Sequence, residues 1–257
     1  MNANEPGQPA PDVIAANIST NLPTPRVAMA VGAHPDDVEF GCGGTLAKWA
    51  ADGCLVHHVV CTDGSKGTWD AAADVRALAE RREGEQVAAA RRLAGEHAGE
   101  VRFLRVVDGE LIPDVEQRRA ITLAIRELRP DVVLGHDPWK RYRLHPDHRA
   151  AGMLVCDAVV AARDPHFFPD LGVAHHRPSH LLLWEADEPD HAEDVTAVIE
   201  RKLEALAAHE SQFESTMHAV DEAELAAFGQ RIRDRLAGLG APYGFAAAEL
   251  FKRISDL

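Results

Sequence analysis

The stretch from Val27 to Thr45 constrains the fold of this chain more than any other. Its sequence is V-A-M-A-V-G-A-H-P-D-D-V-E-F-G-C-G-G-T. The apolar run Val27–Val31 is typical of a buried parallel strand. The run stops at Gly32, and the polar segment His34–Asp37 follows where the strand should open into a loop. Ligands bind at the carboxyl ends of strands in open α/β sheets, so we expect a ligand site here.

Strand and helix patterns alternate along the rest of the chain. Segments rich in β-branched and apolar residues predict strands, and Ala-rich or amphipathic segments predict helices. The expected strands are 55–62, 101–106, 131–135 and 180–185, and the expected helices are 46–51, 74–93, 114–128, 149–162 and a region from about residue 194. This alternation implies parallel strands with right-handed crossovers. It predicts an α/β protein, a Rossmann-like three-layer α/β/α domain with a mostly parallel central sheet.

Length and composition bound the organisation of the chain. With 257 residues and no internal boundary, residues 25–257 are expected to form a single domain. Residues 1–24 lack a basic segment followed by an apolar one, so they are expected to be a flexible tail or arm and not a signal peptide. The four cysteines include no C-x-x-C pair, which indicates reduced thiols and a cytoplasmic protein.

Charge and hydropathy exclude two classes of partner. Asp and Glu number 41 against 27 Lys and Arg, a formal charge of −14, which argues against general nucleic-acid binding. No stretch is long and apolar enough to span a bilayer. A small molecule is therefore the expected partner, and a homo-oligomer is compatible with the sequence.

Two polar clusters carry the chemistry. The first is His34–Asp37, and the second is His145–His148, H-P-D-H, in the loop after the expected strand 131–135. Both follow strands, so both should lie on the same rim of the sheet. Catalytic zinc needs about three N or O ligands and one open position. It also needs a carboxylate to take a proton from water. One histidine and one aspartate from the first cluster and one histidine from the second would satisfy the metal.

The two clusters resemble those of the zinc-dependent N-deacetylase family called LmbE-like or PIG-L. A-H-P-D-D at 33–37 and H-P-D-H at 145–148 stand in the right order after the first and fourth expected strands. T-D-G at 62–64, R-E-G-E at 82–85 and H-E-S-Q at 209–212 extend the resemblance over most of the chain. Members of the family include N-acetylglucosaminyl-phosphatidylinositol deacetylases and the deacetylases of mycothiol and bacillithiol biosynthesis.

The resemblance implies a role for each matching residue. The implied metal ligands are His34, Asp37 and His148. The implied catalytic residues are Asp36 as general base, His145 protonated over the developing oxyanion, and Asp147 holding a histidine in orientation. Arg82 matches a position that grips substrate, and Asp63 of the T-D-G motif is expected to bind substrate with it. The oxyanion histidine is expected to be His145 and not His136, because one tight loop can bring His145 and His148 to the metal together.

The loop before the second cluster departs from part of the family. Some mycothiol-pathway members place a tyrosine two residues before H-P-D-H, where this chain has Arg143 next to Tyr142. Lys140, Arg141 and Arg149 are also close by, and this basic segment predicts an anionic or strongly polar substrate.

These observations predict a zinc-dependent hydrolase that removes an N-acetyl or other N-acyl group from an amino sugar. Other divalent transition metals suit the same ligand set. Two alternatives stay open at this point. One is an amidase that cleaves a larger amide, such as a mycothiol-type conjugate. The other is a non-catalytic Rossmann-like binding domain, in which Asp36 or Asp37 simply caps the following helix.

Overall fold

The computed structural model describes residues 18–257. The strands in this part of the chain are β1 Ser19–Thr20, β2 Val27–Gly32, β3 Leu55–Thr62, β4 Ala98–Val106, β5 Val132–His136, β6 His180–Trp184, β7 His191–Asp194 and β8 Ala248–Ser255. The α-helices are α1 Asp37–Ala51, α2 Val75–Ala94, α3 Val115–Leu128, α4 Pro146–Arg163, α5 Ile199–Leu206 and α6 Glu222–Gly240.

All eight strands belong to one sheet, in the order β1-β7-β8-β6-β5-β2-β3-β4. The run β6-β5-β2-β3-β4 is parallel throughout, and only β8 runs antiparallel to its neighbours, β6 and β7. The prediction of a mostly parallel sheet is therefore confirmed. Because one sheet contains every described strand, we propose that residues 25–257 form a single domain.

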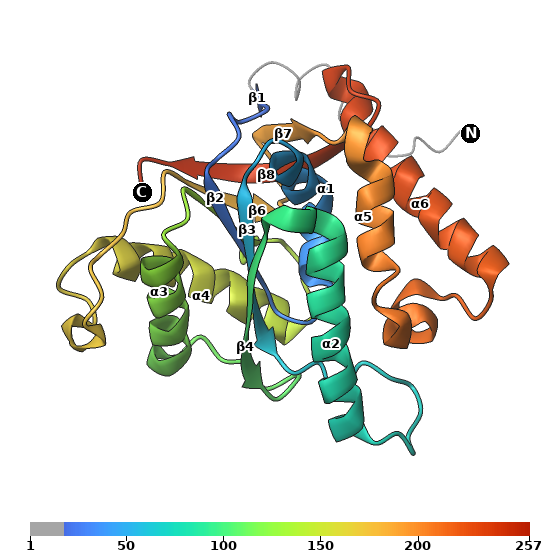
Figure 1. Cartoon of the computed structure of the whole chain (residues 1–257), viewed down its shortest axis with the longest axis horizontal. Helices are drawn as coiled ribbons and strands as arrows, with labels where there is room; N and C mark the ends of the chain where they lie inside the picture. The colour runs from blue at the N-terminus through green and yellow to red at the C-terminus, as the bar shows by residue number, and fades with distance from the viewer. Residues whose placement is uncertain (1–17) are drawn as a thin grey trace, which may run out of the picture.

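Helices cover both faces of this sheet (Figure 1). Helices α3 and α4 pack together on one face, and α1, α2 and α5 pack on the other. The alternation of side chains along β2 explains the two cores. Met29 and Val31 lie in the apolar cluster with residues of α3 and α4, whereas Ala28 and Ala30 lie in the cluster with residues of α1. The expected three-layer α/β/α, Rossmann-like fold is confirmed.

Strand β2 is the point at which the strand order reverses. It pairs with β3 on one side and with β5 on the other, all three parallel. The chain that follows β2 and the chain that follows β5 therefore leave the same edge of the sheet from adjacent strands. A crevice at such a switch point is where open α/β sheets bind ligands. This topology brings the His34–Asp37 and His145–His148 clusters together.

Helix α1 begins nine residues before the position expected from the sequence. The glycines at 41, 43 and 44 suggested a loop, but α1 starts at Asp37 and contains one non-helical residue, Cys42, with φ −145°. The carboxylate of Glu249 on β8 accepts hydrogen bonds from the backbone N–H groups of Gly44 and Thr45. Those groups lose helical partners at the break, so a distant residue stabilises a helix that local propensity disfavours.

The expected tail also needs a correction. Residues 1–17 lie outside the described residues, but Ser19–Thr20 form β1, which pairs in parallel with β7. Glu193 of β7 accepts a hydrogen bond from the backbone N–H of Leu22 at 2.8 Å. Two residues are too few to show a strand period in sequence. Among residues 18–257, no helix is long and apolar enough to cross a membrane.

Candidate active site

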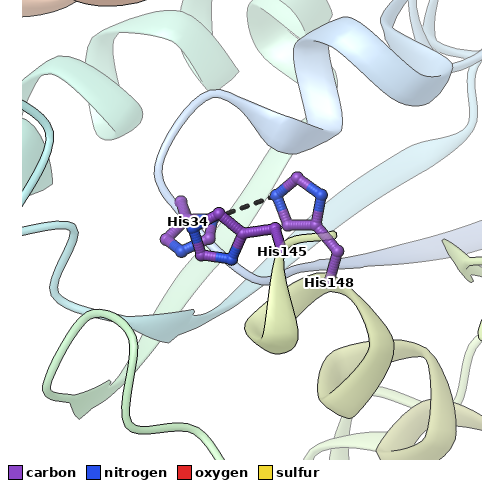
Figure 2. Close-up of side chains that lie close together, drawn as sticks. All are labelled: His34, His145 and His148. Atoms are coloured by element: carbon purple, nitrogen blue, oxygen red, sulfur yellow. Dashed lines mark hydrogen bonds between the residues drawn. The ribbon is translucent and has the colours of Figure 1, made fainter. Parts of the chain in front are cut away.

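Three side chains from the two clusters converge beyond the ends of β2 and β5. Figure 2 shows the rings of His34, His145 and His148 close together, with a hydrogen bond between His34 and His148. His34 Nδ1 lies 3.2 Å from His148 Nε2 and 3.3 Å from Asp37 Oδ2. Asp37 Oδ1 lies 3.3 Å from His148 Nε2. The residues implied to be metal ligands are thus in mutual contact through their ligand atoms.

This spacing fits a tetrahedral metal. Zinc binds N and O ligands at about 2.0–2.1 Å, so two ligand atoms of a tetrahedral site stand about 3.3 Å apart. The two histidine nitrogens stand 3.2 Å apart, and each lies 3.3 Å from a different oxygen of Asp37, so the separations are close to that value without defining one set of three ligand atoms. Two histidines and a carboxylate leave one position open for water or substrate, as catalytic zinc requires. The cluster is able to bind a metal, and the ligand assignment stays a prediction.

Two carboxylates hold the outer nitrogen of His34. Its Nε2 lies 3.1 Å from Asp147 Oδ2 and 3.3 Å from Asp108 Oδ1. Burial lowers the pKa of His34, but hydrogen bonds to Asp108, Asp147 and Asp37 raise the pKa by more than burial lowers it. The net pKa therefore lies well above its usual value. These contacts place the ring proton on Nε2 and leave Nδ1 toward the metal position. The contact with Asp147 suits its expected orienting role, while Asp108 was not singled out from the sequence, although it follows a strand.

His136, the last residue of β5, lies behind Asp37. It is 2% exposed, and its Nε2 is 3.2 Å from Asp37 Oδ2. Its other nitrogen, Nδ1, accepts hydrogen bonds from Trp184 Nε1 at 3.0 Å and from Arg143 Nη1 at 3.1 Å. Indole and guanidinium groups are donors only, so Nδ1 carries no proton and Nε2 carries one. His136 therefore presents an N–H to Asp37 and not a lone pair to a metal.

The position of Trp184 depends on a glycine of α1. A Cβ built on Gly41 would stand 2.6 Å from the Trp184 indole, closer than real Cβ atoms approach. The indole can pack against the helix only because residue 41 has no side chain. This contact aims the indole N–H at His136. Gly41 also belongs to the glycine-rich segment that made the start of α1 hard to recognise from sequence.

Asp36 contacts Arg82 through its carboxylate. Its φ of 104° is a left-handed conformation that L residues rarely adopt, and it turns the chain between two adjacent aspartates. Its Oδ2 lies 3.3 Å from Arg82 Nη2. Burial, opposed by the Arg82 guanidinium and assisted by the Asp37 carboxylate, raises the pKa of Asp36 to about 6. A carboxylate with such a pKa is suited to accept a proton near neutral pH.

A buried polar network supports the backbone of Asp36. Its N–H donates to Gln86 Oε1 at 2.9 Å, and Gln86 Nε2 donates to Glu39 Oε1 at 2.8 Å. His209, the first residue of the H-E-S-Q motif, has Nε2 3.3 Å from Glu39 Oε2. All three supporting side chains are at most 1% exposed. The motif near the end of the chain thus contributes to the frame around the expected base.

His145 lies at the cavity wall beside His34 and His148, the two histidines expected to bind the metal. Its ring centroid lies 4.5 Å from that of His34 and 4.8 Å from that of His148 (Figure 2). Burial and the two neighbouring histidines lower the pKa of His145, which departs from the expectation of a protonated ring. A neutral imidazole still has one N–H to donate. The position is suited to an oxyanion contact, which stays a prediction for this residue.

The two expected substrate-binding residues have different surroundings. Arg82 lines the cavity but is 3% exposed, and its guanidinium also donates to the carbonyl oxygens of Gly64 and Pro35. These bonds make it a support for Asp36. Asp63 does not line the cavity, and its Oδ1 accepts hydrogen bonds from the backbone N–H groups of Ser65 and Asp108. The Asp63 side chain therefore stabilises the loops that contain Ser65 and Asp108, and the expected contact with substrate has no support in these positions.

Two cations of the basic segment, Arg143 and Lys140, have carboxylate partners within the chain. Arg143 Nη2 lies 3.0 Å from Glu185 Oε2, and Lys140 donates to the carbonyl oxygen of Glu185 at 3.0 Å. Arg149 donates to the carbonyl oxygens of Arg143 and Leu144. Neutral carbonyl groups leave the positive charge of Arg149 uncompensated, so the expectation of an anionic or strongly polar substrate stays a prediction. Tyr142 is 87% exposed and lies outside the cavity lining.

The converging side chains line a cavity of about 530 Å³. Its walls include the three expected ligands, the expected base and His145. The size falls within the roughly 300–1,000 Å³ of small-molecule sites. The site therefore combines a potential metal position, a buried carboxylate and room for a small substrate.

Comparison with known families assigns the chain to one of them. Residues 29–159, just over half of the chain, match the family model described as PIG-L, GlcNAc-PI de-N-acetylase. The chain belongs to the PIG-L family. The resemblance drawn from the A-H-P-D-D and H-P-D-H motifs is thus confirmed, and both motifs lie within the matched residues of this PIG-L protein.

Relatives of this PIG-L protein are named as deacetylases. Diacetylchitobiose deacetylase of Thermococcus kodakarensis is 38% identical over 191 residues, covering 73% of this chain and 70% of the relative. The 1D-myo-inositol 2-acetamido-2-deoxy-alpha-D-glucopyranoside deacetylase 2 of Saccharopolyspora erythraea is 33% identical over 229 residues, covering 72% of this chain and 82% of the relative. The structure is similar to that of N,N'-diacetylchitobiose deacetylase from Pyrococcus horikoshii in complex with its inhibitor MPG. That match has a TM-score of 0.80 and 30% identity over 90% of this chain and 84% of the other.

Proposed function

We propose that this chain is a metal-dependent hydrolase that removes the N-acetyl group from a small molecule containing N-acetylglucosamine. The observation that carries the proposal is the convergence of His34, Asp37 and His148 beside a separately held carboxylate, Asp36. The PIG-L relatives named above are deacetylases of acetylated amino sugars. We infer zinc as the metal from the N/N/O ligand set and the tetrahedral spacing.

A divalent ion bound by these three residues would polarise the amide carbonyl and lower the pKa of the attacking water. Asp36 accepts a proton from that water as its oxygen forms a bond to the carbonyl carbon. Burial keeps the Asp36 carboxylate basic enough for this step, and Arg82 holds its orientation. His145 donates an N–H to the oxyanion that develops on the former carbonyl oxygen.

The carbon–nitrogen bond then breaks and acetate leaves. The sugar nitrogen takes up one proton and departs as the free amine, so the overall reaction consumes one water. Asp36 holds the proton taken from the water, lines the same cavity as the expected metal ligands, and returns the proton to the nitrogen. We propose this return as the source of the amine proton.

The two alternatives are weaker. His136 contacts the carboxylate of Asp37, and Asp108 and Asp147 both contact the ring of His34. A non-catalytic binding domain would not require the expected metal ligands to be oriented by such contacts. An amidase for mycothiol-type conjugates is not favoured, because the relatives named above are deacetylases.

Detection of free amine tests the proposal directly. The purified protein is stripped with a chelator, reloaded with zinc, and incubated with a panel of N-acetylated sugars that includes N-acetylglucosamine. We expect amine and acetate in equal amounts with zinc and none after chelation. His145→Ala should retain zinc and lose about 10²–10³-fold in kcat, the effect of one oxyanion donor. Release of no amine from any sugar by the zinc-loaded protein would overturn the proposal.

A further inference from the structure

Glu185 follows the last residue of β6 and holds a backbone conformation that L residues rarely adopt. Its φ is 59°, and the residue before it, Trp184, pairs with His136 across the adjacent strands β6 and β5. Glu185 lines the catalytic cavity, and its side chain is 34% exposed. Strained backbone of this kind gathers at functional sites, where the surrounding structure holds it in place. The end of a third parallel strand therefore supplies a charged group to the cavity.

Arg143 is the partner of this carboxylate inside the protein. Its Nη2 lies 3.0 Å from Glu185 Oε2, and the Arg143 side chain is 4% exposed. The other carboxylate oxygen, Glu185 Oε1, lies 3.7 Å from Nη2 of Arg235 on α6, whose side chain is 59% exposed. An exposed guanidinium stays hydrated, whereas a buried one needs a charged partner. Arg143 is therefore the cation that depends on Glu185.

The guanidinium of Arg143 lies against the expected metal ligands. Its Nη1 is 3.1 Å from His136 Nδ1 and 3.5 Å from His148 Nδ1. His136 in turn contacts the Asp37 carboxylate through Nε2. A chain of contacts thus runs from Glu185 through Arg143 and His136 to an expected metal ligand.

An uncompensated cation at the position of Arg143 would oppose a metal ion. Like charges repel more strongly inside a protein than in water, because the effective dielectric constant is lower. The carboxylate of Glu185 offsets this charge, so the guanidinium can donate to His136 with little repulsion of a divalent ion. The planar guanidinium also has donors on two sides, and the carboxylate on one side fixes the direction of the other.

We propose that Glu185 and Arg143 act together as positioning residues for the metal centre. Arg143 holds His136 in the tautomer that donates to Asp37, and Glu185 orients the guanidinium and offsets its charge. The pair thereby sets the affinity for the metal from outside the ligand set. This inference rests on the metal ligands of the proposed function, but it does not depend on which amide the protein cleaves.

Zinc affinities of four proteins test the inference. The wild type, Glu185→Gln, Arg143→Gln and the double variant are stripped of metal as full-length proteins. Their zinc dissociation constants are then measured by competition with a chromophoric chelator. Glu185→Gln should raise the constant by about 10–100-fold, because it leaves the guanidinium uncompensated beside the ligands. In the Arg143→Gln background no such cation remains, so Glu185→Gln should then have little effect, as expected for two residues of one network.

Two further variants separate positioning from a general effect of charge. Asp187→Asn removes a carboxylate from the same loop, where it lies 3.7 Å from Lys140, and it should leave the zinc affinity unchanged. Glu185→Asp keeps the carboxylate, and aspartate tolerates a positive φ better than most residues. Glu185→Asp should therefore restore part of the zinc affinity that Glu185→Gln loses.

The outcomes decide the inference without a measurement of catalysis. Equal zinc affinity in Glu185→Gln and wild type would overturn it, and so would an equal loss of affinity with and without Arg143. A loss in Asp187→Asn as large as in Glu185→Gln would also overturn it. If Arg143→Gln does not fold, the comparison of wild type with the Glu185 and Asp187 variants still decides. Zinc affinities as expected, with no amine released from any sugar, would overturn the proposed function alone.

Discussion

His136 Nε2 lies 3.2 Å from Asp37 Oδ2, with a buried indole and a guanidinium fixing the opposite ring nitrogen as an acceptor. This relationship makes His136 an orienting partner of an expected metal ligand. Carboxylate ligands in metal sites are commonly held this way, and the loss of such a partner weakens metal binding about 10–100-fold. His136 is the last residue of β5, so the end of a parallel strand again supplies a functional group.

Replacement of His136 is therefore expected to weaken metal binding. His136→Phe should raise the zinc dissociation constant by about 10–100-fold, measured by competition with a chromophoric chelator. His136→Gln keeps an N–H donor near the Nε2 position and should recover part of the affinity. His176→Gln, remote from the cavity, is the matched control. Equal zinc affinity in His136→Phe and wild type would contradict the orienting role.

Arg82 is expected to act on rate and not on substrate binding. Arg82→Gln removes the cation that lowers the pKa of Asp36, so that pKa should rise by about 1–3 units. The acid limb of kcat/KM then moves to higher pH, and kcat falls while KM changes little. Steady-state kinetics from pH 5 to pH 9 would measure both. A raised KM with an unmoved pH profile would instead support the direct grip on substrate expected from the sequence.

The wild-type pH profile follows from the same carboxylate. Asp36 is active as a base only when deprotonated, so kcat/KM should rise with pH through its pKa. Burial raises that pKa to about 6 in the metal-free chain, and a divalent ion bound beside it would favour the carboxylate. The acid limb should therefore lie at or below about pH 6. Zinc content measured at each pH separates this limb from loss of metal, and activity that falls steadily from pH 5 to pH 7 would contradict the assignment.

Much of this arrangement could be read from the chain. The ends of the parallel strands were predictable because β2, β3 and β5 are apolar runs that stop at polar residues. The two clusters met because β2 and β5 are neighbours, which strand alternation alone does not specify. Contacts between segments that are far apart in the chain could not be predicted from the sequence. Glu249 stabilises the break in α1 from β8, and no local pattern near Gly44 reveals it.

The far edge of the sheet was missed for a related reason. Strand β8 falls in the region from about residue 194 that was expected to be helical, and β7, the polar segment H-A-E-D, lies just before that region, where no strand was expected. Buried polar residues there have partners within the strand and on other elements: His191 donates to Glu193 of the same strand, and Lys48 of α1 forms an ion pair with Glu193. Hydrophobic alternation cannot report a strand whose buried residues are charged and paired.

Glu193 stabilises this edge of the sheet, where β7 lies, by an amount that depends on pH. Burial alone would raise its pKa, but the hydrogen bond from His191 and the Lys48 ammonium outweigh burial and lower the pKa below its usual value. The unfolded chain then binds more protons, so this stabilisation is present above about pH 4.5 and is lost as pH falls through the folded pKa. Glu193→Gln should lower the free energy of unfolding by about 1–3 kcal/mol at pH 7. Urea unfolding of the metal-free protein should show that the difference in free energy of unfolding between wild type and Glu193→Gln becomes smaller below pH 4.5. A difference that does not change with pH would contradict this account.

The central claim is that adjacent aspartates have separate roles, Asp37 on the metal and Asp36 on the proton. The most direct measurement is zinc content together with single-turnover rate for Asp36→Asn and Asp37→Asn, each beside wild type. Asp36→Asn should hold zinc near wild-type occupancy and lose about 10²–10⁴-fold in rate, because an amide cannot accept the proton of water. Asp37→Asn should lose zinc. Loss of zinc in Asp36→Asn with retention in Asp37→Asn would reverse the two roles and contradict the account.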